Sequence, residues 1–123
     1  MSEHTIEQWA KVAARAASSK KADDPVVLDV GAVLAITDYF VIVSGSNTRQ
    51  VRTIADAVEE EVRRDGGPSP IRVEGLDDLK WVLLDYGDFV VHVFLDETRK
   101  YYELERLWSD VPRLAWAESV TTF

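Results

Sequence analysis

The side chains best able to do chemistry in this chain lie between residues 81 and 94, Trp81-Val-Leu-Leu-Asp-Tyr-Gly-Asp-Phe-Val-Val-His-Val-Phe94. The imidazole of His92 and the carboxylate of Asp85 are groups that can orient one another or move a proton. The pair Gly87-Asp88 separates two β-rich runs, which is typical of a two-residue hairpin turn. Such a hairpin places Asp85 and His92 diagonally on one face, where they could pair. No nucleophile accompanies them in the sequence to complete a catalytic triad.

The two faces of this expected hairpin differ in composition. Residues directly opposite each other on paired strands share a face. One face is wholly apolar and is predicted to be core: Val82, Leu84, Tyr86, Phe89, Val91 and Val93. The other face pairs Trp81 with Phe94, Leu83 with His92, and Asp85 with Val90. We interpret it as a recognition surface, with cover by a helix as the alternative, and Asp78 adds negative charge just before Trp81.

A second candidate is Gly45-Ser46, between an apolar strand and a helix. This arrangement resembles the phosphate cradle that opens the nucleotidyltransferase fold. Nucleotidyl transfer also requires metal-bound carboxylates on the following strands. The next strand, residues 71–74, has Arg72 where an aspartate would be needed, and the later strand offers His92 among valines. The sequence therefore predicts neither catalysis nor a metal or cofactor. A nucleotide-binding or nucleotidyltransferase-like protein is kept as one alternative, and a generic acidic dimerisation module as another.

Composition limits the classes of molecule that this chain is expected to bind. The chain has 123 residues, with 22 acidic and 14 basic side chains and a formal net charge of −8. This charge repels phosphate, which disfavours nucleic acid as the main ligand and favours a basic protein partner. No cysteine is present, which excludes disulfides and thiolate metal sites. No apolar run reaches the length of a membrane span, so no membrane partner and a cytoplasmic location are expected.

Hydrophobic periodicity predicts one α/β domain over residues 1–112, followed by a C-terminal tail over 113–123 that is free to be flexible. The domain should hold a five-stranded mixed sheet packed with about three helices. Strands are expected at 26–30, 39–44 and 71–74, followed by the hairpin. The first two strands should be antiparallel, and a parallel crossover should join 39–44 to 71–74. Strand order stays undetermined.

Helices are expected from Thr5, after Asn47, and from Asp96 to Ser109. Thr5 and Asn47 are suitable N-caps, and each has a glutamine three residues on. The apolar stripes that should face the core are Ile6, Trp9, Ala10, Ala13, Ala16 and Ala17 in the first helix, Val51, Ile54, Ala55, Val58 and Val62 in the second, and Tyr101, Leu104, Leu107 and Trp108 in the third.

Several motifs together resemble one family. They are Thr37-Asp-Tyr-Phe-Val-Ile-Val-Ser-Gly-Ser46, Gln50, Ile54-Ala-Asp56, Glu74-Gly75, Trp81, Asp85, Gly87-Asp88, Val90-Val-His92 and Tyr102-Glu-Leu-Glu-Arg-Leu-Trp108. In order and spacing they closely resemble the ribosomal silencing factor family, also called the RsfS or Iojap family, from about Val27 to Pro112. Beyond Pro112 we recognise no counterpart.

The resemblance implies a non-enzymatic repressor of translation with a nucleotidyltransferase-like fold that lacks the catalytic carboxylates. Members bind ribosomal protein fourteen of the large subunit, keep the small subunit from joining when nutrients are scarce, and are commonly homodimers. Trp81 matches the family tryptophan implicated in that contact. Asp85, Asp88 and His92 match neighbouring motif positions. Together with Phe94 and Asp78 from the hairpin face, these are the expected partner-binding residues.

Overall fold

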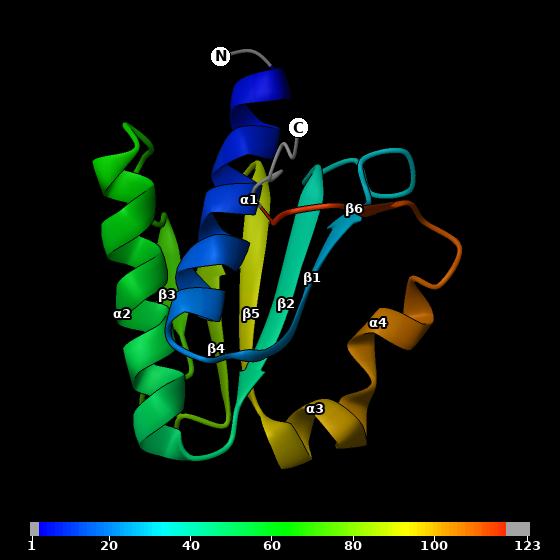
Figure 1. Ribbon diagram of the computed structural model, residues 1–123. Helices are drawn as coiled ribbons and strands as arrows, with labels where there is room; N and C mark the ends of the chain where they lie inside the picture. The colour runs from blue at the N-terminus through cyan, green and yellow to red at the C-terminus, as the bar shows by residue number, and fades with distance from the viewer. Residues whose placement is uncertain (1–2, 118–123) are drawn as a thin grey trace, which may run out of the picture.

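A six-stranded mixed sheet forms the centre of the computed structural model, which describes residues 3–117. The elements in chain order are α1 (Glu3–Ser19), β1 (Asp23–Asp29), β2 (Tyr39–Gly45), α2 (Thr48–Arg64), β3 (Arg72–Glu74), β4 (Trp81–Asp85), β5 (Phe89–Leu95), α3 (Asp96–Tyr102), α4 (Leu104–Leu107) and β6 (Arg113–Leu114). The strand order is β3-β4-β5-β2-β1-β6 (Figure 1). The single α/β domain is therefore confirmed, with one strand more than expected. None of the described helices is long and apolar enough to span a bilayer.

The hairpin has the predicted register. Trp81 pairs with Phe94, Leu83 with His92, and Asp85 with Val90. Gly87 adopts a φ of 85° at the turn, and its backbone N–H donates to the Asp85 carboxylate at 2.8 Å. Positive φ is accessible to glycine because it lacks a Cβ. The turn therefore fixes which side chains share each face of the sheet.

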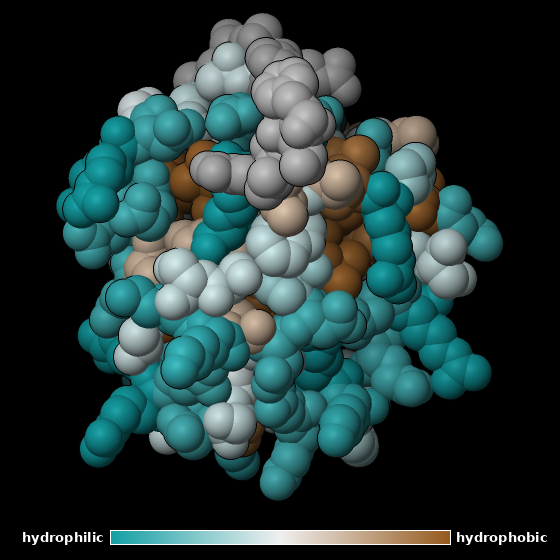
Figure 2. Space-filling model, in the orientation of Figure 1, coloured by the Kyte–Doolittle hydropathy of each residue, from teal (hydrophilic) through white to brown (hydrophobic). Residues whose placement is uncertain are grey.

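Helices α1 and α2 lie together over one face of the sheet (Figure 1). The predicted stripes of both helices are buried there, against the apolar hairpin face and the inward residues Tyr39, Val41 and Val43 of β2. Asn47 caps α2 by accepting from the backbone N–H of Gln50 at 2.8 Å, as predicted. Figure 2 looks onto this side, where hydrophilic side chains cover most of the coloured surface. This layer is the main core.

A smaller core lies on the opposite face of the sheet. Its buried members are Val26, Leu28, Val30, Ile42 and Phe94. The helices on this side, α3 and α4, are short. Leu104 and Trp108 pack against the cluster. Trp81 lies at the margin of this cluster and is half-buried.

Two expectations about the C-terminal part differ from the structure. The expected helix over 96–109 breaks at Glu103, whose φ and ψ of 48° are left-handed. Leu104 and Trp108 still face the core, but Tyr101 and Leu107 are 81% and 74% exposed. The first residues of the expected tail form a strand, since β6 pairs Leu114 with Val27 and adds the sixth strand. The left-handed conformation costs free energy at a non-glycine residue, so tertiary contacts must hold Glu103 there.

The predicted strand pairings are otherwise confirmed, with one refinement. β1 and β2 are antiparallel. β2 is parallel to β5, and both β3–β4 and β4–β5 are antiparallel. β3 therefore runs parallel to β2, as expected for the crossover through α2, but β4 and β5 lie between them. The sequence did not predict the position of β4 and β5 between these strands, because the strand order was undetermined.

Candidate functional site

Trp81 is the centre of an aromatic cluster on the thinly covered face of the sheet. Its ring centroid lies 4.7 Å from that of Phe94 and 5.0 Å from that of Tyr102. Phe94 is fully buried, whereas Trp81 is half-buried and Tyr102 is 52% exposed. A cleft beside the indole is lined by Asp78, Lys80, Trp81, Leu95, Glu97, Thr98, Tyr101 and Tyr102. Trp81 thus rests on the core through one part of its surface and reaches solvent through another.

His92 orients this indole. The Trp81 Nε1–H donates to His92 Nδ1 at 3.1 Å. Since Nδ1 accepts, the neutral ring carries its proton on Nε2. His92 is 5% exposed, and burial lowers its pKa to about 4, so the imidazole is neutral at physiological pH. His92 and Phe94 therefore lie beneath the surface, where they can support Trp81 but not form a broad contact with a partner.

The acidic candidates lie around the same face. Asp85 does not pair with His92 as expected, because its two oxygens bind the Gly87 N–H at 2.8 Å and Arg72 at 3.3 Å. Arg72 lies opposite Asp85 in the β3–β4 register, which explains this choice. Asp78 and Asp88 are exposed. The structure thus brings Asp78 to the cleft beside Trp81 and leaves Asp85 and Asp88 near the turn of the hairpin.

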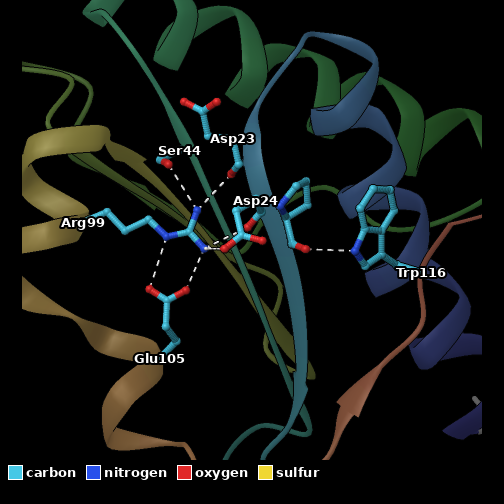
Figure 3. A network of polar contacts seen from close by, with 7 residues as sticks. Asp23, Asp24, Ser44, Arg99, Glu105 and Trp116 are labelled. Carbon is cyan, nitrogen blue, oxygen red and sulfur yellow. Dashed lines mark hydrogen bonds and ion pairs between the residues drawn. The ribbon is translucent and has the colours of Figure 1, made fainter.

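Arg99 attaches the α3–α4 segment to the sheet, and the sequence analysis did not single it out. Its guanidinium donates to the backbone carbonyls of Asp23 and Asp24 at 2.9 and 2.8 Å, to Ser44 Oγ at 3.1 Å, and to the Glu105 carboxylate at 2.6 Å (Figure 3). Arg99 is 8% exposed. Because Tyr102 follows Arg99 in α3, this network also holds Tyr102 beside Trp81.

Gly75 is a second supporting residue, directly after β3. Its φ is 91°, and a Cβ at this position would lie 1.9 Å from the carbonyl oxygen of Trp81. Only glycine allows the chain to pass so close to the Trp81 backbone. The motif Glu74-Gly75 was the sequence signal for this position, although its reason is visible only in three dimensions.

The Gly45-Ser46 loop is occupied by a side chain of the protein itself. Gln50 Oε1 accepts from the Ser46 backbone N–H at 2.7 Å and from Ser46 Oγ at 3.0 Å. The Gln50 amide nitrogen donates to the carbonyls of Lys20 and Lys21. A phosphate would have to displace this bridge, because it would need the same donors. Among the described residues, no three His, Asp or Glu side chains gather at a metal-binding spacing.

Comparison with known proteins decides the family. The profile described as "Ribosomal silencing factor during starvation" matches residues 3–122. This chain belongs to the RsfS family. The Ribosomal silencing factor RsfS of Bacillus subtilis is 41% identical over 102 residues, which cover 83% of this chain and 86% of that protein. The mouse protein named "Mitochondrial assembly of ribosomal large subunit protein 1" is 36% identical over 92 residues, which are 73% of this chain and 40% of that protein.

Solved structures show the same fold. A crystal structure of a protein from Chromobacterium violaceum has a TM-score of 0.79 and 31% identity, with 93% of each chain covered. A crystal structure of a protein from Bacillus halodurans has a TM-score of 0.70 and 38% identity, covering 85% of this chain and 93% of that chain. The resemblance drawn from the sequence motifs is therefore confirmed, and this RsfS-family chain has a role in ribosomal silencing.

Proposed function

We propose that this RsfS-family protein represses translation without chemistry, by binding ribosomal protein fourteen of the large subunit and so preventing the small subunit from joining. The role in silencing comes from the family, whereas the partner and the blocking step rest on the family resemblance. The observation that supports a docking role is the half-buried Trp81, held by His92 on a thinly covered sheet face. Its place of action in this proposal is the cytoplasm, and a homodimer remains a prediction.

The proposed contact combines an aromatic anchor with charge. Trp81 and the exposed Tyr101 and Tyr102 offer apolar area that loses water on docking. Tryptophan and tyrosine are over-represented among the residues that dominate interface energies. Asp78 and Glu97 line the same cleft, with Lys80 as the opposing charge. Together with the net charge of −8, they favour approach of a basic ribosomal surface and predict an association rate that falls with salt.

The test is co-sedimentation of the protein with purified large ribosomal subunits in sucrose gradients. Wild type should sediment with free large subunits and lower the yield of joined ribosomes when small subunits are added. Trp81→Ala should weaken binding by about tenfold to a hundredfold, mainly through faster dissociation. Because Trp81 also packs on Phe94, a thermal melt of each variant establishes that it is folded.

A matched pair of charge variants separates the surface from the overall charge. Asp78→Asn changes the cleft beside Trp81, whereas Asp56→Asn removes the same charge from the exposed side of α2. Asp78→Asn should slow association more than Asp56→Asn does. If Trp81→Ala and Asp78→Asn both bind as wild type does, the surface is not the docking site. If wild type itself does not sediment with large subunits, the proposed function is wrong.

A further inference from the structure

A second pocket opens on the same face of the sheet, at the turn end of the hairpin. Its volume is about 320 Å³, and it is lined by Leu34, Ile36, Thr37, Phe40, Ile71, Arg72, Leu83, Asp85, Gly87, Val90 and His92. These residues come from the β1–β2 loop, β2, the start of β3, and the hairpin of β4 and β5. Ile36 and Ile71 are 85% and 76% exposed. Large apolar side chains that stay in water around a hollow are typical of a binding site.

Two buried polar atoms belong to residues that line this pocket and have no hydrogen-bond partner within the described part of the chain. They are Thr37 Oγ1 and His92 Nε2, on side chains that are 7% and 5% exposed. His92 Nε2 carries the proton, because Nδ1 accepts from Trp81. Buried donors without acceptors cost free energy, and native proteins contain few of them. Both atoms lie below the surface that a partner would touch, so an occupant would contact the exposed apolar rim rather than these atoms.

We infer that this pocket is a second anchor site, which receives an aliphatic side chain from a basic segment of the same ribosomal partner that Trp81 binds. The inference rests on the proposed function. The pocket is linked to Trp81 through His92, which accepts from the Trp81 indole and also lines the pocket.

Charge selects this occupant over a second copy of the chain. Two copies would each bring a net charge of −8 to the contact. At the pocket, Arg72 is already paired with Asp85 at 3.3 Å and with Glu74 at 3.6 Å. Asp88, next to the lining residue Gly87, is exposed. A lysine or arginine beside the inserted side chain would therefore meet a carboxylate, whereas an acidic chain would be repelled.

The experiment uses two pocket variants and one matched control. Ile36→Ser and Ile71→Ser remove exposed apolar side chains from the pocket rim. Val33→Ser removes a side chain that is 63% exposed on the same loop as Ile36 but does not line the pocket. Affinity for purified large subunits is measured for the full chain, with Trp81→Ala alongside. Each pocket variant should weaken binding by about fivefold to tenfold, while Val33→Ser binds as wild type does.

The outcomes separate this inference from the proposed function. If Trp81→Ala weakens binding and both pocket variants bind as wild type does, the second anchor is wrong while the docking surface stands. If wild type fails to bind large subunits at all, the proposed function fails first. If the pocket variants leave ribosome binding unchanged and instead dissociate a dimer in analytical ultracentrifugation, the occupant is a second copy and the inference is overturned.

Discussion

The buried histidine under Trp81 makes stability depend on pH in a calculable way. Burial lowers the pKa of His92 from 6.5 to about 4. Between these values the unfolded chain binds a proton that the folded protein does not, so acid favours unfolding. This contribution to stability is complete above pH 6.5 and is lost as the pH falls toward 4. Linkage gives a loss of about 2 kcal/mol between pH 7.5 and pH 5, and of about 3 kcal/mol in all.

The perturbation that isolates this effect is His92→Gln. A glutamine carbonyl can accept from the Trp81 N–H but does not titrate. The variant should be less stable than wild type at pH 7.5, because the amide packs less well against Phe40, whose ring lies 4.9 Å from the imidazole. As the pH falls, the wild type should lose its advantage by about 2 kcal/mol by pH 5. Carboxylates titrate in both proteins and cancel in the difference.

Urea unfolding at a series of pH values measures this difference, followed by the fluorescence of the chain's tryptophans. The two curves of unfolding free energy against pH should converge below pH 6.5. Parallel curves between pH 7.5 and pH 5 would refute the reasoning, because they would mean that His92 titrates alike in the folded and unfolded chains. A second readout is the Trp81 indole N–H signal in NMR spectra, which should shift as Nδ1 becomes protonated and can no longer accept.

Two further predictions concern the support of Trp81. Gly75→Ala should destabilise the protein by about 3 kcal/mol or more, since its Cβ would overlap the Trp81 carbonyl, whereas Gly66→Ala, with a φ of 85° and nothing within 4 Å, should cost about 1 kcal/mol in the same urea titration. Equal costs would contradict the proposed steric reason. Arg99→Met should cost about 3 kcal/mol because it leaves the Glu105 carboxylate, whose side chain is 22% exposed, without its partner, and a loss below about 1 kcal/mol in calorimetry would count against that role.

The features of this fold that could be predicted from the sequence are those set by residues close together in the chain. The hairpin register followed from one Gly-Asp turn, and the stripes of α1 and α2 followed from helical periodicity. The break at Glu103 could not be predicted, because a helix with an apolar face was an equally good local solution. The segment with the break is held to the sheet by Arg99, whose partners Asp23 and Asp24 are 75 or more residues away in the chain.

The candidate site divides in the same way. The mixed face around Trp81 was predicted, because strand alternation fixes which side chains share it. The hydrogen bond of His92 with the indole, rather than with Asp85, was not predicted. It depends on Arg72 of β3, which binds the Asp85 carboxylate. Tyr102 was expected in a continuous helix, but the break at Glu103 leaves it half-exposed against Trp81.

The Gln50 bridge has a consequence for how such a protein can respond to its surroundings. With the Ser46 donors already occupied, a nucleotide phosphate would have to displace Gln50 before it could use them. In this chain one carboxamide therefore keeps the loop between β2 and α2 closed to an anion until it is displaced.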